Sequence, residues 1–193
     1  MWEALLWSTG VVALGEMGDK TQLLALMLAA RFKRPWTIVA GIAVATAANH
    51  ALAALFGHWV AQQLGATVLR WALGLGFLLM AAWMLIPDRA DDDEGAAERQ
   101  RFGVFGTTVV AFFLAEMGDK TQLATVALAA RYSALLTVIT GTTLGLLLAN
   151  VPAVFLGDAL AKRVPMRLVH ALAALGFVAM GLLTLLKGDA LFA

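Results

Sequence analysis

Six long stretches of apolar residues divide the chain, separated by short polar connections. They lie at residues 4–30, 36–61, 67–86, 104–130, 134–161 and 166–186. Each is long enough to cross a hydrocarbon core of about 30 Å, which takes roughly 20 helical residues. The stretches are about twice the length of a membrane β-strand and do not alternate between apolar and polar positions. The pattern therefore predicts an all-α membrane protein with six transmembrane helices.

Composition agrees with this pattern. Hydrophobic residues make up 61% of the chain, charged residues 14%, and the mean hydropathy is +0.82. A soluble domain has about 45–50% apolar and about 25% charged residues. The lipid bilayer is thus one predicted partner, whereas the basic residues are too dispersed for nucleic-acid binding. The first stretch is too long for the core of a signal peptide and has no basic flank before it, so we expect the mature protein to retain it.

A seven-residue motif, EMGDKTQ, interrupts two of the apolar stretches. It stands at residues 16–22 and again at 116–122. A charged side chain at a helix centre costs about 2.5–3.5 kcal/mol even on a lenient insertion scale, so these charges are not expected to face lipid. Intramembrane carboxylates and lysines are a functional-site hypothesis by default.

The motif belongs to a longer internal repeat. A shift of 100 residues aligns 16–31 with 116–131, and 12 of the 16 positions are identical. The repeats are predicted at 1–86 and 104–193, joined by an acidic linker at 87–103. Three crossings per repeat place the second copy in the membrane with opposite orientation, which predicts an inverted-topology repeat. That architecture is typical of secondary transporters.

The distribution of Lys and Arg predicts the orientation, because positive residues concentrate on the cytoplasmic side. One side carries nine of them and the other side three. The nine are Arg31, Lys33, Arg34, Arg89, Arg99, Arg101, Lys162, Arg163 and Arg167; the three are Arg70, Arg131 and Lys187. The linker is therefore expected in the cytoplasm and both termini outside it.

Inverted repeats bring equivalent mid-helix residues together, so the two motifs predict one shared site. The predicted metal ligands are Glu16, Asp19, Gln22, Glu116, Asp119 and Gln122. On a continuous helix the Glu, Asp and Lys of each motif would share one face, and a Glu four positions before a Lys favours an ion pair within that helix. Residues predicted to balance charge or to gate the site are Lys20, Lys120, Thr21, Thr121, Gly18 and Gly118.

Two residue types in the motif leave alternatives open. The threonines either face the site or bond back to their own helix backbone. The glycines either allow tight helix packing or let a helix open a carbonyl toward an ion.

Charge and ligand type narrow the chemistry of this site. Four carboxylates and two ammonium groups leave a net charge of −2, which one divalent cation or two protons would neutralise. The chain has no cysteine, and oxygen ligands favour hard cations such as Ca²⁺, Mg²⁺ and Mn²⁺. No prosthetic group is predicted, and no nucleophile–base arrangement indicates an enzyme. The alternative is that the charges form structural salt bridges.

Several polar or small residues outside the motif have two interpretations each. Asn49 and Asn150 would supply further oxygens or make contacts between helices. The unduplicated histidines, His50, His58 and His170, would be ligands or proton relays, or have packing roles. A GxxxG pattern at 141–145 predicts close helix contact.

The paired E-x-G-D-K/R-T/S motif in a small six-helix protein resembles the family that includes human transmembrane protein 165 and its yeast Golgi and bacterial relatives. This resemblance covers the whole chain and implies antiport of Mn²⁺ and Ca²⁺ against protons, with the four motif acids as ion ligands. The chain lacks the leader of organellar members, so a bacterial inner membrane is expected. We therefore expect export of Mn²⁺ first and Ca²⁺ second in exchange for H⁺. An amino-acid-type solute exporter and a passive divalent cation channel are the alternatives.

Overall fold

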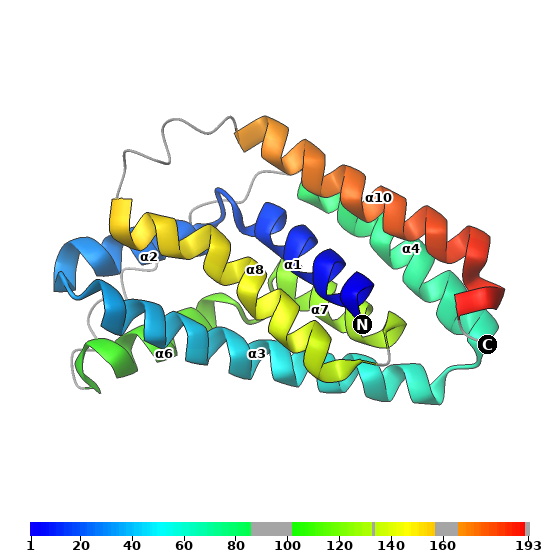
Figure 1. Ribbon diagram of the computed structural model, residues 1–193, viewed down its shortest axis with the longest axis horizontal. Coiled ribbons are helices and arrows are strands. Elements are labelled where there is room, and N and C mark those ends of the chain that lie inside the picture. The colour runs from blue at the N-terminus through cyan, green and yellow to red at the C-terminus, as the bar shows by residue number, and fades with distance from the viewer. Residues whose placement is uncertain (86–101, 133, 157–165, 192–193) are drawn as a thin grey trace.

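The computed structural model describes residues 1–85, 102–132, 134–156 and 166–191, and these residues form eight helices (Figure 1). Most of the predicted linker at 87–103 lies outside them. The helices are α1 (Trp2–Glu16), α2 (Lys20–Phe32), α3 (Pro35–Gln63), α4 (Ala66–Met84), α6 (Gly103–Ala115), α7 (Lys120–Arg131), α8 (Leu135–Leu156) and α10 (Met166–Leu191). The all-helical prediction is confirmed for the described part of the chain.

The stretches 4–30 and 104–130 are not single helices, and the expectation that each motif lies on one continuous helix is wrong. Helix α1 ends at Glu16 and α2 begins at Lys20, while α6 ends at Ala115 and α7 begins at Lys120. Gly18 and Gly118 have φ angles of 84° and 76°. This left-handed conformation suits glycine because a Cβ would clash there. The glycines therefore allow the chain to leave one helix and start another inside the motif.

Helices α3 and α8 each pack along the two helices that flank the motif of the other half. Helix α3 contacts both α6 and α7, and α8 contacts both α1 and α2. The GxxxG prediction is confirmed: a Cβ at Gly145 would lie 2.6 Å from the Thr9 carbonyl oxygen of α1, and one at Gly141 would lie 2.8 Å from Ser8 Cβ. Helices α4 and α10 lie side by side and have α1 and α7 as their other main neighbours (Figure 1).

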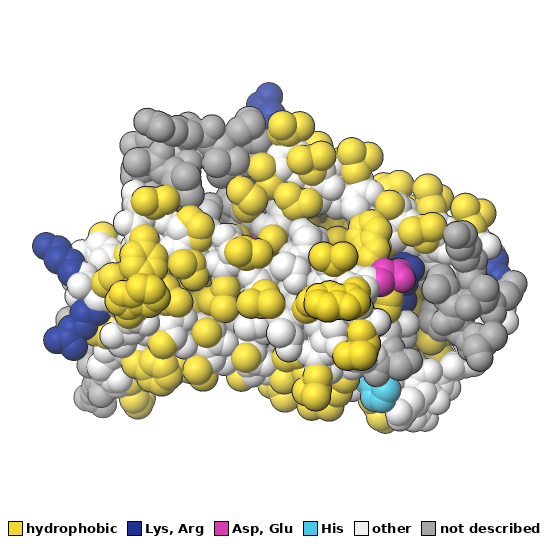
Figure 2. All heavy atoms as spheres, viewed as in Figure 1, with side chains coloured by type: hydrophobic (Ala, Val, Ile, Leu, Met, Phe, Trp, Pro, Cys, Tyr) yellow, Lys and Arg dark blue, Asp and Glu magenta, His cyan; other side chains and the backbone are white. Residues whose placement is uncertain are grey.

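The surface is that of a membrane protein. Four described helical stretches are long and apolar enough to span a bilayer: Pro35–Gln63, Ala66–Met84, Leu135–Leu156 and Arg167–Leu186. Large hydrophobic side chains such as Leu52, Leu79 and Leu148 are more than half exposed. Figure 2 shows such side chains across the visible face, with charged groups mainly near its margins. Lipid contact accounts for this apolar surface.

Candidate cation site

Three buried carboxylates from the two motifs converge where the broken helices meet. One oxygen each from Glu16, Glu116 and Asp119 can be chosen so that all three lie within 4.8 Å of one another. Both glutamates are fully buried, and Asp119 is 7% exposed. Glu16 ends α1, Glu116 follows α6, and Asp119 is the N-cap of α7. Two segments separated by 100 residues therefore form one acidic cluster.

The lysine of the first motif reaches across to the second motif. Lys20 Nζ lies 3.6 Å from Asp119 Oδ1. The predicted ion pair between Glu16 and Lys20 on one helix is wrong, because the break places these residues on two different helices. Lys20 keeps 34% of its side chain exposed, whereas Lys120 is almost fully buried and lies 5.9 Å from the Trp83 ring centroid. The two lysines therefore differ in environment although their motifs are identical.

The motif threonines face the carboxylates, which decides between the two orientations considered from sequence. Thr21 Oγ1 donates to Glu16 Oε2 over 2.7 Å, and Thr121 Oγ1 donates to Glu116 Oε2 over 3.2 Å. The Thr121 hydroxyl also lies 3.4 Å from Asp119 Oδ2, and the Thr121 backbone N–H donates to the same oxygen over 3.4 Å. These bonds hold the carboxylates in place and leave Oε1 of both glutamates without a hydrogen-bond partner.

The motif glutamines brace the helix breaks. Gln22 Oε1 accepts from the Gly18 N–H over 3.0 Å, and Gln122 Oε1 accepts from the Gly118 N–H over 2.7 Å. Their side-chain amides donate to the Ala149 carbonyl of α8 and to Asn49 Oδ1 of α3. One backbone N–H in each break is thus satisfied by a glutamine side chain. The glutamines as metal ligands stay a prediction.

Asp19 lies outside the group of three converging carboxylates, although it is only 4% exposed. It is the N-cap of α2 and has an interaction of its own. Of the two asparagines, Asn49 donates to the Phe113 carbonyl and Asn150 donates to the Leu146 carbonyl. Asn150 keeps a buried Oδ1 without a hydrogen-bond partner. Asp19 and the asparagines as ligands stay predictions.

The three histidines have three different environments. His170 Nε2 of α10 lies 3.1 Å from the carbonyl oxygen of Met17, the residue after α1 ends. His58 pairs with Gln62 on the exposed surface of α3, and His50 is fully buried with both ring nitrogens unpartnered. The His170 contact was missed from sequence because the carbonyl that receives it is freed only by the helix break.

The chain is thus a helical membrane protein with a buried acidic site built from a duplicated motif. It matches the family model described as "Divalent cation/proton antiporter GDT1" over residues 4–92 and 104–191. The chain therefore belongs to the GDT1 family of divalent cation/proton antiporters, which confirms the family predicted from the paired motif. Members of this family are transporters and not enzymes.

Curated relatives agree with this assignment. A Vibrio cholerae protein named "Putative manganese exporter" is 51% identical over 178 residues, which cover 92% of this chain and 88% of that protein. "GDT1-like protein sll0615" of Synechocystis is 28% identical, covering 86% of this chain and 89% of its own. "GDT1-like protein 3" of Oryza sativa subsp. indica is 27% identical, covering 92% and 72%. No solved structure matches the chain.

Proposed function

We propose that the chain exports Mn²⁺ from the cytoplasm in exchange for protons, with Ca²⁺ as the second candidate substrate. The observation that carries the proposal is the convergence of Glu16, Glu116 and Asp119 within 4.8 Å in a buried site. In this proposal these three carboxylates bind the transported cation. Lys20 binds Asp119 when no metal is present, and Thr21 and Thr121 orient the glutamates.

Electrostatics support exchange at this site. Two ionised carboxylates 4.8 Å apart repel each other by about 3.5 kcal/mol at an effective dielectric constant of about 20. Lys20 offsets one of these three charges, and the remaining repulsion requires further positive charge. A divalent cation or protons can supply that charge, and each excludes the other when both need the same oxygens. Competition of this kind is the physical basis of an antiporter.

We further propose that the halves are inverted repeats related by a two-fold axis, with the broken pairs α1–α2 and α6–α7 each crossing the membrane once. Residues 100 positions apart meet at two places, which supports the axis. One is the pair Glu16 and Glu116, and the other is Phe77 against Phe177, whose ring centroids are 6.3 Å apart. In this account both termini lie outside the cytoplasm of a bacterium, and the protein lies in the inner membrane.

The oxygen-only ligand set supports a hard cation as substrate. The name of the Vibrio cholerae relative supports manganese among these cations. A site made of three converging carboxylates suits a small cation better than the apolar side chain of an amino acid. The solute-exporter alternative is therefore less favoured than cation transport.

The test is proton flux in proteoliposomes that contain the purified protein and a trapped pH-sensitive dye. Mn²⁺, Ca²⁺ and Mg²⁺ are added separately, with Glu116→Gln as the site variant. Glu98→Gln in the linker is the matched control, because it makes the same chemical change outside both motifs. We expect Mn²⁺ to move protons in the wild type and the control, and not in the site variant. Mn²⁺ entry without proton movement, detected in parallel with a trapped metal-sensitive dye, would indicate a channel.

A further inference from the structure

Arg131, at the end of α7, has a buried guanidinium group. It is the last residue of α7, directly after the predicted apolar stretch 104–130, and only 3% of its side chain is exposed. A buried arginine requires partners that satisfy its charge and its donors. Its partners come from two other helices.

These contacts join α7 to α1 and α10. Arg131 Nη1 donates to the Met180 carbonyl over 3.3 Å and to Thr184 Oγ1 over 3.0 Å, both on α10. Arg131 Nη2 lies 3.8 Å from Glu3 Oε1 of α1. Tyr132 donates from its hydroxyl to the same Glu3 oxygen over 3.1 Å, and its ring centroid lies 5.1 Å from the Arg131 Cζ. We call Glu3, Arg131, Tyr132 and Thr184 the Arg131 cluster.

The equivalent position in the first half is Arg31, and its environment differs. Both arginines end the same four-residue sequence, LAAR, and both lie in the last turn of the helix that follows the motif. Arg31 is nevertheless exposed, with the Phe32 ring centroid 5.7 Å from its Cζ. The preceding alanines differ in the same way, since Ala30 is exposed and Ala130 is buried. The identical LAAR segments are therefore more buried in the second half of the chain than in the first half.

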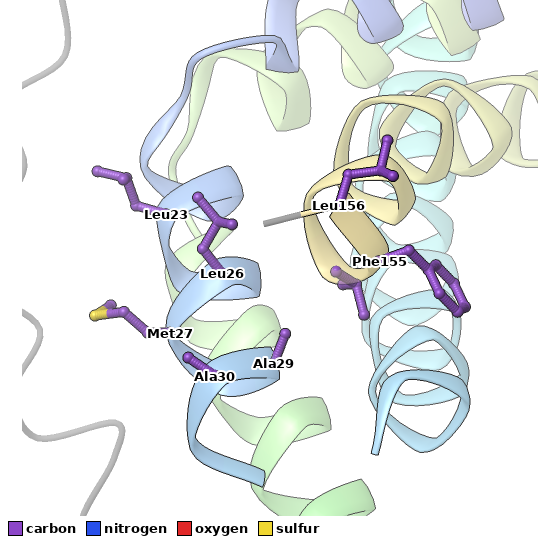
Figure 3. Close-up of a pocket in the computed structure, with 8 residues that line it drawn as sticks. Leu23, Leu26, Met27, Ala29, Ala30, Phe155 and Leu156 are labelled. Carbon is purple, nitrogen blue, oxygen red and sulfur yellow. The ribbon is translucent and has the colours of Figure 1, made fainter. Parts of the chain in front are cut away.

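The packing of α2 repeats this difference. A Cβ at Gly57 of α3 would lie 2.1 Å from the Val126 carbonyl oxygen, so α3 and α7 are in close contact. Leu26 occupies the position equivalent to Val126, and it lines a groove of about 560 Å³ between α2 and the end of α8. Figure 3 shows this groove, with Leu26 and Ala29 from α2 and Phe155 and Leu156 from α8. The bundle is thus closed around α7 and splayed around α2.

We propose that Arg131 is a gating residue whose cluster holds the α4–α10 pair against α1 and α7. This rests on the cation/proton exchange proposed above, and it adds that the site opens alternately to the two sides of the membrane. In the alternate state Arg131 leaves α10, the α4–α10 pair moves toward α2 and α6, and the bundle opens at the Arg131 end. Arg31 then docks near Met80 of α4, the position equivalent to Met180. Arginine suits this role because its planar fork binds two acceptors at once.

The two gates are unequal, and this sets the resting state. Positions 103 and 84, equivalent to Glu3 and Thr184, hold Gly103 and Met84, which offer Arg31 neither a carboxylate nor a hydroxyl. The alternate state therefore has the weaker gate. The resting protein is closed at the Arg131 end and open at the Arg31 end, which carries Lys33 and Arg34 and is the predicted cytoplasmic side. An exporter that rests in this way binds its metal from the cytoplasm.

The experiment measures two spin-label distances in the full-length protein, whose lack of native cysteine allows selective labelling. One pair, at the exposed positions Leu6 and Leu182, reports separation of α1 from α10; the other, at Met27 and Leu79, reports approach of α2 and α4. In Arg131→Ala we expect the first distance to lengthen and the second to shorten, with the alternate population rising roughly tenfold. Arg131→Lys should give an intermediate shift, since it keeps the charge but loses the fork.

Arg31→Ala is the matched control and should leave both resting distances unchanged. Thr184→Val removes one acceptor with little change in shape and should shift both distances in the same directions as Arg131→Ala, by a smaller amount. Unchanged distances in folded Arg131→Ala and Thr184→Val would overturn the gate. Loss of order at both pairs would overturn it too, because it indicates local unfolding. Reciprocal shifts in a protein that moves no metal would support the gate and refute the proposed function.

Discussion

The ammonium group of Lys20 lies 3.6 Å from the Asp119 carboxylate, and this ion pair joins the two halves of the chain at the acidic site. The contact forms beside the helix break, since Lys20 begins α2 and Asp119 is the N-cap of α7. In the proposed cycle Lys20 occupies Asp119 whenever the metal is absent. Lysine, proton and metal thus compete for neighbouring oxygens.

This competition predicts coupling between Lys20 and Asp119 in metal binding. Lys20→Gln should strengthen Mn²⁺ binding, because it removes a positive charge next to a ligand, and Asp119→Asn should weaken it. In the double variant, Lys20→Gln has no carboxylate to release. The change in the binding free energy of the double variant should therefore differ from the sum of the two single changes by roughly 0.5–3 kcal/mol. Titration calorimetry on the four proteins measures this difference. Strict additivity would refute the direct interaction.

Thr121 is predicted to matter for transport through its hydroxyl. Thr121→Val removes the bonds to Glu116 and Asp119 while keeping the shape of the side chain, and should reduce Mn²⁺ transport about tenfold or more, because losing even one bond to a charged group costs about 1.5–3 kcal/mol. Thr125→Val is the matched control, since Thr125 lies one turn later and its hydroxyl donates to the Thr121 backbone carbonyl. Equal transport rates in the two variants would count against an orienting role.

Gly118 is predicted to be required for its backbone conformation and not for space. A Cβ at this position would meet no atom within 4 Å, yet φ is 76°. Gly118→Ala should therefore strain the break by about 1–2 kcal/mol and lower both transport and thermal stability. Gly10→Ala in α1 also meets no atom within 4 Å but has no positive φ, so it should be close to neutral. A Gly118→Ala protein as stable as Gly10→Ala would contradict this assignment.

Gly57 is predicted to be required for space and not for its backbone conformation. Any side chain there would collide with the Val126 carbonyl, so Gly57→Ala should lower the thermal midpoint by a shift that corresponds to about 1–3 kcal/mol or more. The control is Gly76→Ala, where a Cβ meets no atom within 4 Å. Thermal unfolding in detergent separates the two. Equal midpoints would mean that α3 and α7 are not in close contact.

The candidate site could be proposed from the sequence because the cost of burying charge in a membrane makes the two motifs stand out. It also predicted that Glu16 and Glu116 meet, from duplication alone. It did not predict the helix breaks, because the apolar stretch continues through Gly18 and a glycine inside a helix has several explanations. For the same reason it assigned Lys20 to the wrong partner.

The environment of Arg131 was beyond sequence analysis for a different reason. Arg31 and Arg131 end identical LAAR segments, so local sequence predicts the same surroundings for both. The packing of α4 and α10 against α1 and α7 makes them differ. That packing is a property of one conformational state, and both states share one sequence.

The most direct test of the shared site is the number of protons released when Mn²⁺ binds. Titration calorimetry of the purified protein in two buffers with different protonation enthalpies gives that number, because metal ligands must lose their protons to bind. The account predicts release of about two protons per Mn²⁺ in the wild type, as charge balance requires, and far fewer in the Glu16→Gln/Glu116→Gln variant. Binding heats that are independent of the buffer in the wild type would contradict it.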